Sequence, residues 1–211
     1  MIELQNFGWN ILTVSFIATL CFSFWAAWGL YDQVTKIWKN RSGKPASNVW
    51  FIYMSGLFAV GAVYGVSIGS IAVTFSCIAR GPLHIPILIG LHRFKGFTRL
   101  EWVLLFSLMC VVLVMIFLPM KGWFFLAISI IGLIPTLKLP WEIWREKTSG
   151  VVSIKLISVY NASTTFWIIY ASVIKDYFLL ASTSASFLLF AATTVLWIKF
   201  RPRLSPLHPV S

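Results

Sequence analysis

The sequence repeats one pattern of apolar spans. Residues 32–96 align with residues 138–202 without a gap, at a constant offset of 106 positions. Identity is low, but the apolar spans, basic stretches and turns coincide, and Tyr64 falls on Tyr170. An internal duplication of apolar spans is typical of membrane carriers built from two repeats. The duplication therefore predicts a membrane protein with two repeats, each containing several spans.

The composition also requires a membrane. Hydrophobic residues make up 59% of the 211 residues, and charged residues make up only 11%. Soluble domains carry about 25% charged residues, and a soluble fold of this size could not bury so much apolar surface. We therefore expect the lipid bilayer to surround most side chains. The net charge of +11 lies mainly between the apolar spans, which indicates membrane topology rather than nucleic-acid binding.

Seven segments are long and apolar enough to be membrane-spanning helices, which need about 20 residues. The fourth segment has no counterpart in the duplication. The predicted fold is therefore all-α and integral to the membrane, with seven transmembrane helices in a parallel 3+1+3 repeat of three-helix bundles. The predicted spans are Gly8–Leu30, Ser47–Val66, Ile71–Leu91, Trp102–Pro119, Trp123–Leu139, Ser153–Ile174 and Tyr177–Ile198.

The same pattern predicts how the chain is divided. We expect a first three-helix repeat over residues 1–97, a linker helix over 98–121 and a second three-helix repeat over 122–203. Residues 204–211 contain two further prolines and are predicted to form a disordered cytoplasmic tail. The single linker helix gives both repeats the same orientation, so the duplication is predicted to be parallel.

The basic residues predict the orientation in the membrane. Fourteen of the seventeen lysines and arginines lie on one side of the predicted spans, whereas the other side has only Lys121 and Lys175. The remaining one, Arg80, lies inside a span. The positive-inside rule places the fourteen in the cytoplasm. We therefore expect a multi-pass protein of the plasma or inner membrane, with its N-terminus outside and its C-terminus in the cytoplasm.

The layout and two short motifs resemble the PQ-loop repeat (MtN3/saliva) superfamily, which includes the SWEET sugar transporters. The family pattern runs Pro-Gln, an aromatic residue, a basic cluster and then serine. The first copy, residues 32–47, has Gln33 but carries Asp32 in place of the proline. The second copy, residues 138–153, lacks the glutamine, and its proline is Pro140. The resemblance implies a SWEET-like seven-helix transporter in which the proline region flexes.

Arg80 is the residue that the apolar spans explain least. It lies about ten residues into the third span, where an arginine costs roughly 2.5–3.5 kcal/mol on insertion scales. The aligned residue is Ser186, so the duplication does not require a cation there. Arg80 could bind an anionic substrate group, or it could be a buried arginine bonded to carbonyls freed by Pro82. His84, four residues further on, lies on the same helix face.

Small polar side chains near the middle of several spans predict a polar layer where the two repeats meet. Carriers bind substrate at such a layer, although ordinary interhelical hydrogen bonds, worth about 0.6–2 kcal/mol each, would use the same residue types. The residues predicted to bind substrate are Ser55, Ser76, Cys77, Arg80, Asn161, Ser182 and Thr183.

A second set of residues lies at the predicted helix ends and hinges. Tyr64 and Tyr170 end the second helix of each repeat, and Asp176 lies in an adjacent outer turn. They predict an outer gate, although a belt of interfacial tyrosines would look the same in the sequence. The gate and hinge residues are Gln33, Tyr64, Pro135, Pro140, Tyr170 and Asp176.

The sequence contains no pattern that indicates an enzyme, a cofactor site or a metal site. The expected function is a facilitator that moves a small polar solute by alternating access, with its site at the midplane between the repeats. The resemblance implies a sugar, whereas Arg80 favours an organic acid or amino acid. The alternative is a seven-helix sorting or ligand receptor that binds a carboxylate through Arg80. The expected partners are the small-molecule substrate and the lipid bilayer, with no nucleic acid and with homo-oligomerisation left open.

Overall fold

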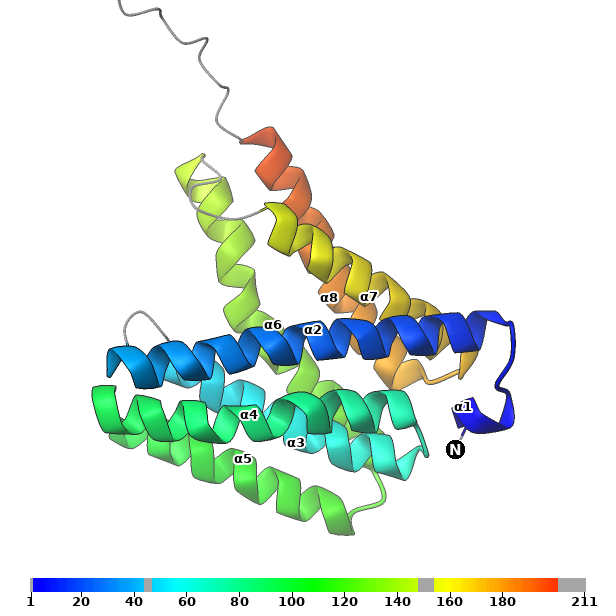
Figure 1. The fold of residues 1–211 in the computed structure, drawn as a ribbon, viewed down its shortest axis with the longest axis horizontal. Coiled ribbons are helices and arrows are strands. Elements are labelled where there is room, and N and C mark those ends of the chain that lie inside the picture. The colour runs from blue at the N-terminus through cyan, green and yellow to red at the C-terminus, as the bar shows by residue number, and fades with distance from the viewer. Residues whose placement is uncertain (1, 44–46, 148–153, 201–211) are drawn as a thin grey trace, which may run out of the picture.

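The computed structural model describes residues 2–43, 47–147 and 154–200, and these residues are almost entirely helical (Figure 1). A four-residue helix precedes seven long ones. The helices are α1 (Ile2–Gln5), α2 (Ile11–Asn40), α3 (Asn48–Ser67), α4 (Ile71–Lys95), α5 (Arg99–Phe117), α6 (Lys121–Glu146), α7 (Ile154–Val173) and α8 (Tyr177–Lys199).

The seven predicted spans fall on α2 to α8, and five of these helices are long and apolar enough to cross a membrane. The five are α2, α3, α4, α5 and α8. In α6 the apolar stretch counted is Lys121–Ile134, because the side chain of the next residue, Pro135, lies outside the described residues. In α7 the apolar residues are interrupted by Asn161 and several hydroxyl side chains. A multi-pass membrane protein is thus supported, and the count of seven spans stays a prediction. The predicted tail lies outside the described residues.

Several helices extend beyond the predicted spans. The first predicted span ends at Leu30, whereas α2 continues to Asn40. Residues 31–40 contain neither glycine nor proline, and Asp32 and Lys36 form an ion pair of 2.5 Å one turn apart. Bilayer thickness limits the apolar part of a helix, but it does not end the helix. Gln33 therefore lies inside α2, and the basic residues Lys36 and Lys39, which follow the predicted span, are helical as well.

Polar side chains fix where the helices begin. Each cap side chain accepts a backbone N–H in the first turn and so pairs a donor that would otherwise have no partner. Thr98 and Glu101 form a capping box at the start of α5. The N-cap residues with such bonds are Asn10, Ser47, Ser70, Thr98 and Asp176.

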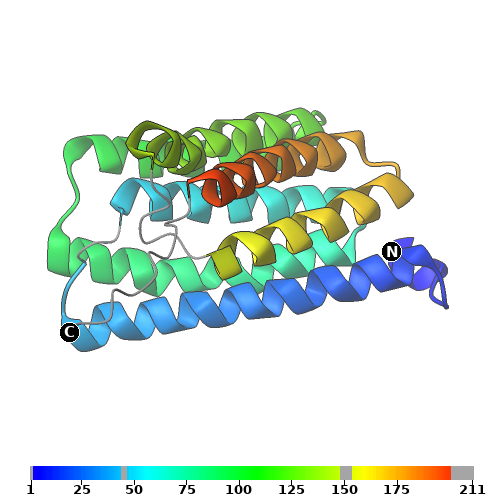
Figure 2. The ribbon, with the colours of Figure 1, turned by 90° about the horizontal axis from the view of Figure 1, so that it is seen from above.

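The long helices pack as two groups of three. Helices α2, α3 and α4 contact one another through α4, and α6, α7 and α8 contact one another through α8. Helix α5 lies mainly against α3 (Figure 1). Figure 2 shows α7 beside the N-terminal part of α2, which is one of the two main contacts between the groups; the other joins α3 to α6. The predicted repeat boundaries at 97 and 122 stay a prediction.

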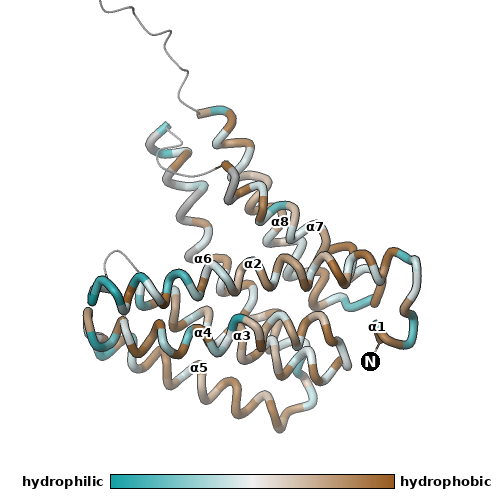
Figure 3. Tube along the Cα trace, viewed as in Figure 1, coloured by the Kyte–Doolittle hydropathy of each residue, from teal (hydrophilic) through white to brown (hydrophobic). Residues whose placement is uncertain are grey.

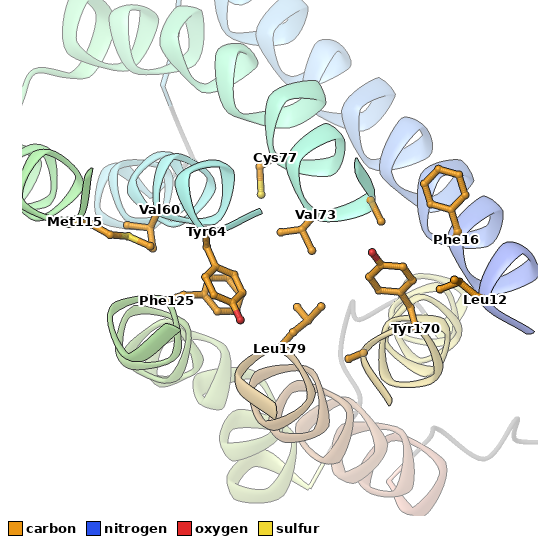
Figure 4. Packing of buried hydrophobic residues seen from close by; sticks show 12 residues of the cluster. Leu12, Phe16, Val60, Tyr64, Val73, Cys77, Met115, Phe125, Tyr170 and Leu179 are labelled. Atoms are coloured by element: carbon orange, nitrogen blue, oxygen red, sulfur yellow. The ribbon is translucent and has the colours of Figure 1, made fainter. Parts of the chain in front are cut away.

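Among the described residues, the two helix groups share a core at one end of the molecule. We call this the α1 end; it contains α1, Tyr64 and Tyr170, and all seven long helices contribute side chains to its core (Figure 4). The opposite end contains Asn40, Lys95 and Lys199. Its buried cluster, Ile37, Phe51, Ile87 and Leu91, comes from α2, α3 and α4 alone among the described residues.

The remaining helix ends lie apart from this second cluster. In Figure 1, the C-terminal parts of α6 and α8 and the start of α7 rise away from α2 toward the opposite end. Figure 3 shows hydrophilic residues gathered on α2 and α4 at that end. The two groups are therefore packed together at the α1 end and separated at the opposite end.

Candidate functional site

Tyr64 and Asp176 join the two helix groups at the α1 end. The Tyr64 hydroxyl, at the end of α3, lies 2.7 and 2.6 Å from the two Asp176 carboxylate oxygens and donates to them. Asp176 is also the N-cap of α8, and its Oδ1 accepts the N–H groups of Phe178 and Leu179 at 3.0 Å each. One carboxylate thus caps a helix and holds a tyrosine from the other group.

Tyr170 makes the second connection between the groups. Its hydroxyl, on α7, lies 2.5 Å from Glu3 Oε1 and 2.6 Å from the Oγ of Ser70, the N-cap of α4. Tyr64 and Tyr170 are 2% and 0% exposed, so neither ring belongs to a lipid-facing belt. The sequence reasoning missed Glu3 and Ser70. Ser70 could have been found, because the offset of 106 places it on Asp176.

Arg80 lies on α4 with its guanidinium partly held by its own helix. Its Nε donates to the Ser76 carbonyl at 2.9 Å, and its guanidinium carbon is 4.6 Å from the centre of the Phe58 ring. Tyr160 of α7, which the sequence reasoning missed, lies within electrostatic range of the guanidinium. Within the described part of the chain, no carboxylate forms an ion pair with Arg80.

The sequence left open whether Arg80 bonds to a carbonyl freed by Pro82, and its observed partner bears on that question. Pro82 lacks the N–H that would bond to the carbonyl of Ile78, four residues earlier. Arg80 instead donates to Ser76, whose carbonyl the proline does not free. A lone backbone bond and one aromatic face leave the cation with donors to spare, because a guanidinium has five N–H groups.

His84 packs beside Arg80 and is fully buried. Its Nδ1 lies 3.0 Å from the Arg80 carbonyl, and its ring lies between the rings of Phe51 and Phe58, at centroid distances of 6.0 and 5.1 Å. Its Nε2 has no hydrogen-bond partner among the described residues. The ring therefore fills space between α3 and α4 and supports the helix face that carries Arg80.

The other predicted substrate-binding residues are engaged within one helix group. Ser76 Oγ lies 2.6 Å from Ser23 Oγ of α2, and Asn161 donates to Thr194 Oγ1 of α8 at 2.8 Å. Ser55, Ser182 and Thr183 each donate to a carbonyl of their own helix. These residues do not converge on one cluster in this conformation.

The predicted hinges lie within continuous helices. Gln33 is half-buried in α2, and Pro140 is buried in α6. Helix α6 runs through Pro135 and Pro140 without a break, although the Pro135 side chain lies outside the described residues. Cys77 is 9% exposed and packs in the core at the α1 end, beside Val73 and Tyr64 (Figure 4).

Two surface hollows are apolar grooves. One, of about 390 Å³, lies between α2 and α7, and the other, of about 430 Å³, lies between α6 and α8. Neither groove is lined by Arg80 or by any other predicted site residue. Their apolar lining suits lipid chains rather than a polar solute.

The fold defines an all-helical, multi-pass membrane protein whose long helices pack in groups of three, one and three. It superposes on the structure of a eukaryotic SWEET transporter with a TM-score of 0.74 and 13% sequence identity, over 90% of this chain and 96% of that chain. No family model and no curated protein matches the chain by sequence. The chain therefore has a SWEET-like fold, as the sequence predicted, whereas membership of the PQ-loop repeat superfamily stays a resemblance.

Proposed function

We propose that this protein is a membrane transporter that carries a small polar solute by alternating access, with two parallel three-helix repeats moving about a site between them. The observation that supports this most is the difference between its two ends. Tyr64 and Tyr170 join the helix groups at the α1 end, whereas the buried cluster at the opposite end comes from one group only. A carrier has to open one end while the other is closed.

The charge pattern supports an orientation for this state. Helices α2, α4 and α8 each carry a basic residue in their last turn, and all three last turns lie at the opposite end. The positive-inside rule places that end in the cytoplasm and the α1 end outside. In this proposal the structure represents the carrier closed to the outside and open to the cytoplasm.

We assign substrate recognition to Arg80 of α4 and Tyr160 of α7, because the two side chains come from different helix groups and lie within electrostatic range of each other. Arg80 has unused donors and no carboxylate partner in the described chain, so a solute with a carboxylate or phosphate group would pair the half-buried cation. This favours an organic acid or amino acid over a neutral sugar.

Uptake into liposomes tests the proposal. The purified protein would be assayed with sugars, amino acids and organic acids, alongside Arg80→Ala and Arg80→Lys. We expect uptake of an anionic or zwitterionic solute that falls about tenfold or more in Arg80→Ala, because a charge-assisted hydrogen bond is worth about 1.5–3 kcal/mol. Arg80→Lys keeps the charge without the planar fork, so it should retain part of the activity.

A matched control and two contrary results make this assay decisive. Arg99→Ala removes an exposed arginine at the start of α5 and should leave uptake unchanged. Equal uptake of a neutral sugar by the wild type and by Arg80→Ala would show that Arg80 is structural. Tight binding of a carboxylate ligand without any flux would identify the protein as the receptor that the sequence left open.

A further inference from the structure

Glu3 is a buried carboxylate in the short N-terminal helix α1. Its side chain is 1% exposed, and its Oε1 accepts hydrogen bonds from Tyr170 at 2.5 Å, from Ser70 at 3.0 Å and from the Ala72 N–H at 3.1 Å. A carboxylate without partners is expensive to bury, so these three donors decide where α1 can lie. Two of these donors, Ser70 and Ala72, belong to the start of α4 and the third, Tyr170, belongs to α7, so Glu3 bridges the two helix groups.

The contacts of Glu3 match those of Asp176 at the duplicated positions. Asp176, the N-cap of α8, holds Tyr64 and accepts the N–H of Phe178. At the offset of 106, the corresponding residues of the other copy are Ser70 for Asp176, Tyr170 for Tyr64 and Ala72 for Phe178.

Glu3 holds Tyr170 and accepts the N–H of Ala72, which are the two equivalent donors. Ser70 caps α4 through its hydroxyl but has no carboxylate. Glu3 thus supplies, from outside the repeat, the negative charge that Ser70 lacks.

We propose that Glu3 is a gate residue and that α1 is a strap, which must withdraw before the α1 end can open. The inference rests on the alternating-access function proposed above. Tyr170 also bonds Ser70 directly, but the carboxylate of its connection is delivered by α1, whereas the Tyr64 connection has its carboxylate within the two helix groups. Leu4 in the strap and Phe7 just after it are 62% and 64% exposed. Besides Glu3, the strap is held by Ile2, whose side chain packs against the core and whose N–H donates to the Gly69 carbonyl.

The native Cys77 can report the opening of the α1 end. It lies about two turns into α4 from the Ser70 N-cap, in the same core as Tyr64 and Tyr170 (Figure 4). Replacing Cys21 and Cys110 with serine leaves Cys77 as the only cysteine of the three. In intact cells, the labelling rate of Cys77 by a membrane-impermeant thiol reagent added outside then measures how often the α1 end opens.

We expect Glu3→Gln to raise the labelling rate roughly tenfold, because three hydrogen bonds to a carboxylate become bonds to a neutral amide. Ser70→Asp placed in the Glu3→Gln background should restore slow labelling, because aspartate is a favoured N-cap and returns the charge to the position that Asp176 occupies in the other copy. Tyr170→Phe removes the donor to the same carboxylate and should resemble Glu3→Gln, which provides a second variant if the first fails to fold.

Two controls separate the strap from the gate, by which we mean the Tyr64 and Tyr170 connections at the α1 end. Glu101→Gln makes the same change in a carboxylate that caps α5 at the opposite end, and it should not alter labelling. Tyr64→Phe breaks the other connection and should raise labelling whether or not the strap acts.

The failures can be told apart. Fast labelling of Tyr64→Phe with wild-type labelling of Glu3→Gln would overturn the strap and keep the gate. Wild-type labelling of both would overturn the gate and, with it, the proposed function. Fast labelling of Glu3→Gln that Ser70→Asp does not reverse would show that Glu3 does not replace the N-cap carboxylate, and would also overturn the inference.

Discussion

At the scale of single residues, the molecule depends on a few polar groups in an apolar chain. Tyr64, Tyr170 and Asp176 could be predicted as a cluster, because they end or begin helices at duplicated positions. Glu3 could not, because it lies outside the duplication and its partner Tyr170 is 167 positions away in the sequence. Arg80 stood out as a charge inside an apolar span, whereas Tyr160 carries no signal that separates it from other tyrosines.

The protonation of Glu3 gives a prediction at this scale. Burial raises the pKa of Glu3. Hydrogen bonds from Tyr170 and from backbone N–H groups, Ala72 among them, together lower it by more than burial raises it, so the pKa lies below its ordinary value of 4.5. A pKa lowered by docking means that docking is favoured by the charged form. The docking energy is therefore fully present above pH 4.5 and is lost as the pH falls below that value.

The prediction is tested by comparing the Cys77 labelling rates of Glu3→Gln and its parent over a range of pH. The ratio of Cys77 labelling rates between Glu3→Gln and the unmutated parent should be large near neutral pH and should approach one as the pH falls below 4.5. The other ionisable side chains near Glu3 are Tyr170 on α7 and, beyond it, Asp176. A ratio that stays constant with pH would show that the charge of Glu3 does not hold the strap.

At the scale of helices, the sequence predicted the elements and most of their ends well, but it ended α2, α4 and α6 too early. Apolar runs located all seven long helices, because hydropathy reports which residues face lipid. The ends differ because α2 continues through Asp32 and Lys36 as an exposed helix. Close contacts between helices could not be predicted either, since Gly65 resembles other glycines in the sequence although it lies against the backbone of α4.

Gly65 tests how closely α3 and α4 must approach. A Cβ atom at this position would lie 2.6 Å from the backbone nitrogen of Thr74, which cannot move aside as a flexible side chain could. Gly65→Ala should therefore destabilise the protein by about 1–3 kcal/mol. A lower midpoint of unfolding in detergent solution would show this.

Gly29 in α2 offers the matched control, because nothing lies within 4 Å of a Cβ atom built there. Alanine is about 0.5–1 kcal/mol more favourable than glycine inside a helix, so Gly29→Ala should be neutral or stabilising. Equal effects of the two substitutions would mean that the α3–α4 contact does not require glycine.

At the scale of the whole molecule, the two helix groups form a shared core at the α1 end and separate toward the opposite end. The SWEET-like fold could be predicted from three features of the sequence. The duplication, the fourth span without a counterpart and the basic residues on one side of the spans together allow few arrangements of the helices. The conformation could not, because a carrier of the kind we propose makes different contacts in each of its states. The predicted polar layer is dispersed for the same reason: Ser76 and Asn161 bond within their own groups in this state.

The central claim is that one end opens as the other closes, and paired distance measurements test it most directly. In a background without native cysteines, one spin-label pair would join exposed positions 67 and 177 at the α1 end, and a second would join positions 39 and 199 at the opposite end. A transported solute should lengthen the first distance and shorten the second in the same molecules. Two distances that stay fixed, or that change in the same direction, would contradict alternating access.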